Sequence, residues 1–122
     1  MTTFPMGPAL LFCPGDRPER FGKAAERADA VILDLEDAVA PRDKEAARKN
    51  LIAAELDPDR TIVRVNPLGT EDFERDLAAL YQTPYRTVML AKTEDGPAVA
   101  RALAGFTVVA LLETALGFLG LG

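Results

Sequence analysis

Several residue types that build common active sites are absent from this sequence. Its 122 residues include no histidine, no serine and no tryptophan, and Cys13 is the only cysteine. Within this chain these absences exclude a Ser-His-Asp triad, a Cys-His pair, a disulfide bond and a zinc site built from histidine or cysteine. Cys13 itself is expected to be a small buried hydrophobic residue. The remaining carboxylates, arginines, lysines and tyrosines favour a site with a hard cation, oxygen ligands and an arginine that binds an anion.

Long apolar runs and a strong excess of positive charge are also absent. No stretch approaches the roughly 18 apolar residues of a membrane-spanning helix, and the first residues lack the basic flank and apolar run of a signal peptide. We therefore expect a cytoplasmic protein. Hydrophobic residues make up 48% of the chain and charged residues 27%, as in a single soluble globular domain. The net charge of −5 comes from interspersed acids and bases, which predicts no binding to nucleic acid or to an anionic membrane.

Five short apolar runs alternate with four segments of helical composition. The runs are almost continuously apolar, as expected of parallel strands covered on both faces, and they span residues 9–13, 30–33, 61–65, 87–90 and 107–112. The helical segments span residues 18–27, 44–55, 71–81 and 97–104. In the second of these an apolar stripe predicts that three basic residues face solvent, namely Lys44, Arg48 and Lys49. Successive strands start 20 to 31 residues apart, the length of right-handed βα units, so the fold class is α/β with a parallel sheet.

Two architectures are built from such units. An open doubly wound sheet can be complete with five strands, whereas a (β/α)8 barrel closes with eight strands and needs ~250 residues. The length favours the open sheet, as in a self-contained flavodoxin-like signalling or binding module. A phosphoacceptor module of that kind needs paired acids after its first strand, an aspartate after its third and a lysine after its fifth, and these positions do not match here. A strand order of 2-1-3-4-5 with helices on both faces would indicate the open sheet, and an order of 1-2-3-4-5 around one concave side would exclude it.

Charged residues gather where the predicted strands end, which is the edge at which parallel α/β folds place their chemistry. Because desolvated charge is costly unless it is paired or used, this gathering favours a functional site. The second strand runs into the segment Asp34-Leu35-Glu36-Asp37, called the acidic loop below. The other charged residues at this edge are Arg17, Arg64, Lys92 and Glu113.

Each of these residues also has a purely structural interpretation. The acidic loop could be a solvated turn that caps a helix. Arg64 lies between two valines and must face a buried anion, which is either a carboxylate of the acidic loop or a substrate carboxylate. Glu113 is either a partner for a cation or a metal ligand. For Lys92 an ion pair or a phosphate contact is favoured over a Schiff base.

Five ordered segments carry a resemblance to a known family. They are residues 11–21, 31–39, 63–66, 89–92 and 112–115, with Lys44 between the second and the third. In this order the sequence resembles the citrate lyase beta-subunit (citryl-CoA lyase-like) family of the HpcH/HpaI aldolase superfamily, whose members are magnesium-dependent carbon-carbon lyases. The resemblance implies a (β/α)8 TIM barrel. Residues 1–122 would then be its amino-terminal portion, a partial barrel of about five parallel strands and four helices that comprises βα units one to four and strand five.

The resemblance also implies an activity. The family cleaves a citryl or malyl-like thioester, carried on coenzyme A or on an acyl carrier protein, to an oxo-acid such as oxaloacetate and an acetyl thioester, with Mg²⁺ as cofactor. By matched position, Glu113 would bind the metal and Arg64 the oxo-acid carboxylate. Glu36 and Asp37 would be catalytic residues with Arg64, and the further substrate-binding residues would be Asp34, Arg17 and Lys44. Members form homo-oligomers, expected to be trimers. The family's second metal-binding aspartate has no counterpart in this sequence, so we expect the isolated chain to be inactive.

Overall fold

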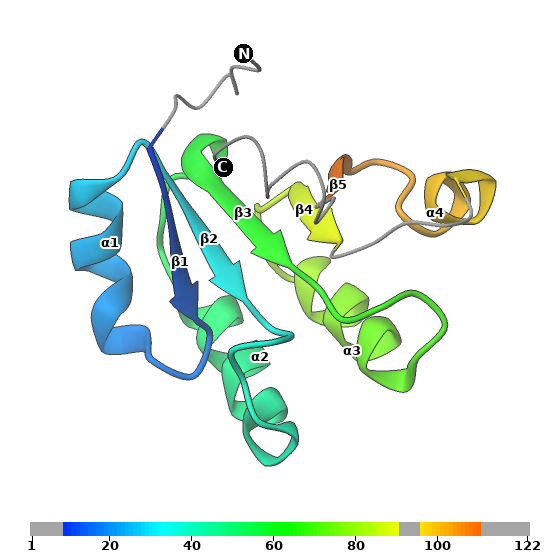
Figure 1. The fold of residues 1–122 in the computed structure, drawn as a ribbon, viewed down its shortest axis with the longest axis horizontal. Helices are drawn as coiled ribbons and strands as arrows, with labels where there is room; N and C mark the ends of the chain where they lie inside the picture. The colour runs from blue at the N-terminus through cyan, green and yellow to red at the C-terminus, as the bar shows by residue number, and fades with distance from the viewer. Residues whose placement is uncertain (1–8, 91–95, 111–122) are drawn as a thin grey trace, which may run out of the picture.

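A parallel sheet of five strands forms the centre of the structure (Figure 1). The structure is a computed structural model, and it describes residues 9–90 and 96–110. Each strand pairs with the next one along the chain, so the order across the sheet is β1-β2-β3-β4-β5. The strands are β1 (Leu10–Pro14), β2 (Ala30–Asp34), β3 (Thr61–Arg64), β4 (Thr87–Leu90) and β5 (Thr107–Ala110). The predicted strands are confirmed, the first four within one residue at either end, and the predicted end of the fifth lies outside the described residues.

Four helices connect the strands, and prolines decide how the connections begin. The helices are α1 (Phe21–Arg27), α2 (Lys44–Ala53), α3 (Glu71–Leu80) and α4 (Gly96–Ala102). Single turns of 3₁₀ helix at Pro18–Arg20 and Pro41–Asp43 lead into α1 and α2, because proline fits the first position of a helix, where its missing N–H is not needed. At α3 the Thr70 hydroxyl accepts a hydrogen bond from the N–H of Phe73 at 3.1 Å and caps the helix.

The helices cover one face of the sheet. Figure 1 shows α1 to α4 in an arc around one side of the strands. A large buried cluster joins side chains of these helices to alternate strand residues such as Val31, Leu33 and Val63. On the opposite face, the strand residues Ile32 and Ile62 belong to a second cluster, in which the described part of the chain has no helical residue. Consecutive strand order and one-sided helices exclude the doubly wound module and confirm the predicted partial barrel.

Buried polar groups in this fold are paired. Tyr85 is fully buried, and its hydroxyl donates to the carbonyl of Ala54 at 2.9 Å and accepts from the N–H of Leu56 at 3.0 Å. The hydroxyl thereby satisfies the backbone just after α2, where the helix has ended and no strand has yet begun. Cys13 is buried as predicted, and burial raises the pKa of its thiol. Within residues 9–90 and 96–110, no buried side-chain nitrogen or oxygen lacks a hydrogen-bond partner.

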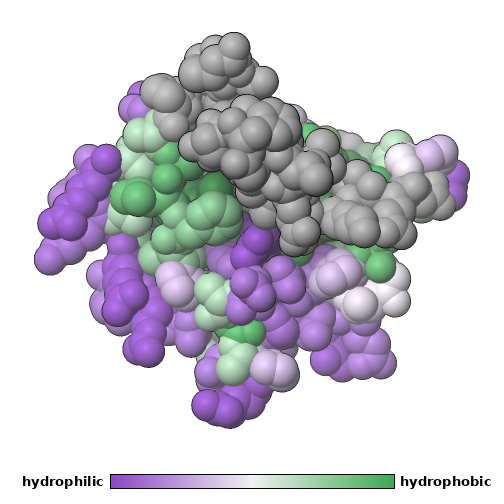
Figure 2. Space-filling view, viewed as in Figure 1, coloured by the Kyte–Doolittle hydropathy of each residue, from purple (hydrophilic) through white to green (hydrophobic). Residues whose placement is uncertain are grey.

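The surface over β1 is the main exposed apolar area on the face shown in Figure 2. Leu11 and Phe12 of β1 are 41% and 50% exposed, although strand residues at matching positions of β2 are fully buried. Hydrophilic side chains border this area on its left and lower sides (Figure 2). In the part of the chain that is described, no helix is long and apolar enough to cross a membrane.

Candidate active site at the carboxyl edge of the sheet

Arg64 and Asp34 form an ion pair at the carboxyl ends of β3 and β2. The parallel register places the two residues directly opposite each other. The Arg64 Nε donates to Asp34 Oδ1 at 3.1 Å, and an Arg64 Nη donates to Asp34 Oδ2 at 2.8 Å, so the pair is bidentate. The two side chains are 11% and 1% exposed. The buried anion that the sequence required for Arg64 is therefore a carboxylate of the acidic loop.

The rest of the acidic loop folds around the same carboxylate. Asp34 Oδ1 also accepts from the backbone N–H of Glu36 at 2.8 Å, and Oδ2 accepts from that of Ala38 at 3.1 Å, in the manner of an Asx turn. The carboxylates of Glu36 and Asp37 lie 3.8 and 4.0 Å from the Arg64 guanidinium, and their side chains are 25% and 82% exposed. The structure thus brings together four of the predicted site residues. Asp34 is buried at their centre beside Arg64, and the Glu36 and Asp37 carboxylates are partly or largely exposed to solvent.

The electrostatics of the pair favour ionisation of both partners. Burial alone would raise the pKa of the Asp34 carboxyl, but the Arg64 guanidinium and the amides of Glu36 and Ala38 outweigh it and hold that pKa below its usual value. The hydrogen bonds to Asp34 raise the pKa of Arg64 against the opposing effect of burial. Arg64 is therefore a permanent cation at this edge of the sheet.

The turn after β1 packs tightly against this edge. The N–H of Gly15 donates to the carbonyl of Asp34 at 2.8 Å, and the carbonyl of Gly15 accepts from the Asn50 side chain at 2.9 Å. A Cβ at position 15 would lie 3.0 Å from both the Asp34 carbonyl oxygen and the Ala47 Cβ. Only glycine lets the turn approach β2 this closely.

Phe12 is a site residue that the sequence analysis did not identify. Its ring centroid lies 5.2 Å from the Arg64 Cζ, a cation–π distance, and the ring is half-exposed. Phe12 pairs in register with Ile32, two residues before Asp34, so strand alternation places all three on one face of the sheet. The signal for Phe12 was this alternation, which becomes useful only when the register between strands is known.

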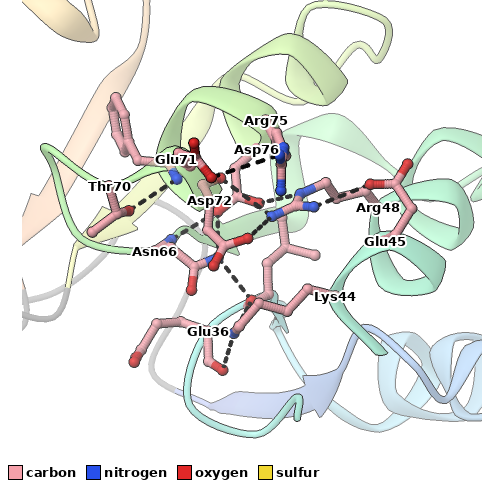
Figure 3. Close-up of polar contacts among 12 residues, drawn as sticks. Glu36, Lys44, Glu45, Arg48, Asn66, Thr70, Glu71, Asp72, Arg75 and Asp76 are labelled. Carbon is pink, nitrogen blue, oxygen red and sulfur yellow. Dashed lines mark hydrogen bonds and ion pairs between the residues drawn. The ribbon is translucent and has the colours of Figure 1, made fainter. Parts of the chain in front are cut away.

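Arg17 and Lys44, both predicted to bind the substrate, occupy different environments. Lys44 is buried, and its Nζ donates to the carbonyls of Leu35 at 3.1 Å and Glu36 at 2.8 Å (Figure 3). Arg17 is exposed; its backbone N–H closes a turn by donating to the carbonyl of Pro14 at 3.0 Å. Its side chain makes no hydrogen bond or ion pair with any other described residue. Lys92 and Glu113 lie outside the described residues, so their predicted roles stay predictions.

A buried polar network lies behind the acidic loop (Figure 3). Asp76 of α3 accepts from Arg48 Nε of α2 at 2.7 Å, and from the backbone N–H and side-chain Nδ2 of Asn66 at 2.8 and 2.7 Å. Asn66 Nδ2 also donates to the carbonyl of Leu35 at 3.0 Å, within the acidic loop. Burial raises the pKa of Asp76, although hydrogen bonds from Asn66 and Arg48 partly oppose this effect. For Arg48, the hydrogen bonds to Asp76 and Asp72 outweigh burial and raise its pKa.

The prediction that α2 presents its basic residues to solvent was wrong for two of the three. Lys49 is exposed, but Lys44 and Arg48 are buried. The apolar stripe, predicted from Ala46, Ala47, Leu51 and Ala54, is confirmed in part. Ala47 and Leu51 are fully buried, Ala54 is half-buried and Ala46 is exposed. The two basic residues are buried because their partners come from other elements, namely the acidic loop and α3, which a pattern within α2 does not show.

The oxygen ligands at this edge suit the surroundings of a hydrated cation. Within residues 9–90 and 96–110, no three histidine, cysteine, aspartate or glutamate side chains are grouped so as to hold a metal ion. Both oxygens of Asp34 are already used by Arg64 and the loop amides. Glu36 and Asp37 are more exposed, and their carboxylate oxygens can accept hydrogen bonds from water molecules bound to a cation.

Comparisons with known proteins give a consistent set of relatives. Residues 9–117 match the HpcH/HpaI aldolase/citrate lyase family. The citrate lyase subunit beta-like protein of Mycobacterium tuberculosis is 59% identical over 111 residues, which cover 91% of this chain and 40% of that protein. The L-malyl-CoA/beta-methylmalyl-CoA lyase of Rhodobacter capsulatus is 46% identical over 77 residues, which cover 59% of this chain and 24% of that protein.

Solved structures agree with these matches. The citrate lyase beta subunit of M. tuberculosis, solved with oxaloacetate and magnesium, is 58% identical with a TM-score of 0.83, over 91% of this chain and 49% of that chain. Protein CitE of M. tuberculosis, solved with magnesium, acetoacetate and coenzyme A, is 58% identical with a TM-score of 0.82, over 85% of this chain and 39% of that chain. The chain thus spans about two fifths of the length of the curated M. tuberculosis relative that it matches.

Proposed function

Because the chain belongs to the HpcH/HpaI aldolase/citrate lyase family, we propose that it is the amino-terminal part of a magnesium-dependent carbon-carbon lyase. In this proposal, the enzyme cleaves a citryl or malyl-like thioester to an oxo-acid such as oxaloacetate and an acetyl thioester. The carrier would be coenzyme A, the group bound in one structure of the M. tuberculosis relative. An acyl carrier protein is the alternative carrier that the sequence resemblance implies. The resemblance also implies a homotrimer, which light scattering on the purified protein tests.

The observation that supports this function best is the number of N–H donors that Arg64 keeps after it has paired with Asp34. An arginine has five N–H donors, and among the described residues Asp34 accepts from Nε and one Nη. Glu36 and Asp37 lie at 3.8 and 4.0 Å, too far for strong hydrogen bonds. Three N–H groups of this immobilised guanidinium are therefore available to a substrate carboxylate. An arginine can bind a carboxylate through two parallel hydrogen bonds, which a lysine cannot do while it also pairs with Asp34.

The charge balance of the site fits a divalent cation beside an oxo-acid. One arginine and three carboxylates, from Asp34, Glu36 and Asp37, give a net charge of −2 when all are ionised. Magnesium, when bound, would act as a Lewis acid on the oxygen of the substrate's reacting carbon. Glu113 is proposed as its protein ligand, and Glu36 and Asp37 as acceptors for the waters around it.

Separate residues of this chain would then bind the substrate and accept its proton. In a retro-Claisen reaction, the hydroxyl of the substrate gives its proton to a base as its carbon becomes a carbonyl, and the carbon-carbon bond to the thioester fragment breaks. The electron pair of that bond leaves with the fragment as a thioester enolate, which takes up a proton to give the acetyl thioester. Arg64 would hold the carboxylate next to that hydroxyl, with Asp34 and Phe12 fixing the guanidinium. Glu36 and Asp37 are the described carboxylates available to accept the proton. Arg17 is exposed and could bind the phosphates of the carrier. The Lys44 ammonium donates to the carbonyls of Leu35 and Glu36 and would thereby hold the acidic loop in place.

A chimera tests this function. Residues 9–117 of this chain would replace the matching segment of the M. tuberculosis relative, and oxaloacetate or glyoxylate release from citryl-CoA and malyl-CoA would be followed with a coupled dehydrogenase. We expect thioester cleavage that EDTA abolishes, and an Arg64→Lys variant whose kcat/KM is about 10–100-fold lower, from the loss of charge-assisted hydrogen bonds. A folded chimera that cleaves neither thioester, or one that Arg64→Lys leaves unchanged, would refute the proposal. The 122-residue chain assayed alone is expected to be inactive.

A further inference from the structure

We propose that Asp76 is a positioning residue, which acts through Asn66 to hold the acidic loop in place beside Arg64. The inference rests on the proposed function, because it assigns the acidic loop to the active site. Asp76 lies on α3, beside Arg48 and Asn66 (Figure 3). Among the described residues, no hydrogen bond or ion pair joins it directly to Arg64 or to the carboxylates of the loop.

The two oxygens of the Asp76 carboxylate have separate partners. Oδ1 accepts from Arg48 Nε, and Oδ2 accepts both the backbone and the side-chain N–H of Asn66. The Asp76 carboxylate is fully buried and Asn66 is 3% exposed. Because Oδ2 receives two hydrogen bonds from one asparagine, it fixes the orientation of the Asn66 amide, which stands two residues after Arg64 in the chain.

Asn66 transmits this orientation to the acidic loop. Its Nδ2 donates to the carbonyl of Leu35, which also accepts from Lys44 Nζ at 3.1 Å. On the other side, the N–H of Leu35 donates to the carbonyl of Arg64 at 2.9 Å. Leu35 stands between Asp34 and Glu36, so this one residue is held at its carbonyl and its N–H by groups that Asp76 and β3 position.

Arg48 gives a matched control because it pairs with two aspartates. It binds Asp76 at 2.7 Å and Asp72 at 2.6 Å, but only Asp76 also binds Asn66. An Asp72→Asn variant therefore removes a carboxylate from the same arginine and leaves the path to the acidic loop intact. Asn66→Ala breaks that path and leaves the pairing of Asp76 with Arg48 intact.

Amide hydrogen exchange, followed by NMR on the 122-residue chain without ligand, tests the inference. The reporters are the amides of Glu36 and Ala38, which bind Asp34, and the reference is the amide of Ile32 within β2. In Asn66→Ala we expect both loop amides to exchange at least about tenfold faster relative to Ile32, because local opening of the loop becomes easier. In Asp72→Asn the same ratio should stay within about threefold of wild type.

Two outcomes would overturn the inference. One is that the loop and strand amides of Asn66→Ala accelerate by the same factor, which a merely structural role predicts. The other is that Asp72→Asn changes the loop ratio as much as Asn66→Ala does. Asp76→Asn, which keeps Asn66 and removes the carboxylate that orients it, is measured against the same criteria, and it carries the test alone if Asn66→Ala does not fold. Because exchange is measured without ligand, an inactive chimera would refute the proposed function and leave this result standing.

Discussion

Replacing Asp34 with asparagine removes the buried negative charge at the centre of the site with almost no change in shape. Breaking a buried ion pair by removing one partner costs about 3–5 kcal/mol, because the other charge remains buried. Arg64 keeps a side-chain exposure of 11% and retains Glu36 and Asp37 at 3.8 and 4.0 Å. We therefore expect Asp34→Asn to lower the free energy of unfolding at pH 7 by about 2–3 kcal/mol, below the full cost of an isolated charge. Urea denaturation followed by circular dichroism measures this loss.

The pH dependence of the same variant gives a sharper test. The pKa of Asp34 in the folded protein lies below its usual value of 3.8, so the folded state binds fewer protons than the unfolded state in this range. The stabilisation from ionised Asp34 is therefore fully present above 3.8 and is lost as the pH falls from there through the folded pKa. Asparagine does not titrate. We expect the difference in unfolding free energy between wild type and Asp34→Asn to shrink steadily as the pH is lowered from about 5 to about 2.

Asp37→Asn is the matched control for this experiment. Asp37 belongs to the same loop and lies 4.0 Å from the same guanidinium, but its side chain is 82% exposed. Exposed ion pairs contribute little, so we expect Asp37→Asn to cost less than about 0.5 kcal/mol at pH 7. The reasoning fails if Asp37→Asn costs as much as Asp34→Asn, or if wild type and Asp34→Asn lose stability in parallel between about pH 5 and pH 2.

Two further substitutions test the packing that supports the site. Tyr85→Phe leaves a partly buried N–H and a partly buried carbonyl without their partner, and we expect a loss of about 1–2 kcal/mol by urea denaturation, against little change for exposed Tyr81→Phe. Gly15→Ala places a Cβ 3.0 Å from Ala47 and from the end of β2, so we expect a lower melting temperature, whereas Gly22→Ala, with open space around it, should stabilise α1 by about 0.5–1 kcal/mol. Equal effects within either pair would contradict these assignments.

The fold could be predicted from the sequence because its main signals are local. Runs such as residues 30–33 are apolar throughout, which is enough to place a strand that is covered on both faces. The choice between open sheet and barrel needed the strand order, which is a long-range property. The predicted starts of α2, α3 and α4 are correct to within one residue, and that of α1 is not. The predicted helix from residue 18 is a 3₁₀ turn followed by α1, because the local hydrogen bonding that distinguishes the two is not encoded in the apolar pattern.

The candidate site shows the same division between local and long-range information. The acidic loop and Arg64 stood out because several charges follow buried strands. Which anion Arg64 faces stayed open until the register placed Asp34 opposite it. Asp76 gave no signal, since an aspartate in an acidic helix is ordinary, and the alternation that concerns Phe12 becomes informative only once the strand register is known. Their roles depend on partners that lie 10 and 52 positions away in the chain, Asn66 and Arg64.

The strand order also has a consequence for how the chain assembles. Residues bonded across the sheet are only 20 to 30 positions apart, because every strand lies beside the one made just before it. During synthesis, β2 can dock on β1, and β3 on β2, as each leaves the ribosome. No strand has to insert between two strands that have already formed. Asp34 and Arg64 come from two such successive strands. The ion pair at the centre of the site can therefore form by the time the first three strands have emerged, before α3 brings Asp76 to lie behind it.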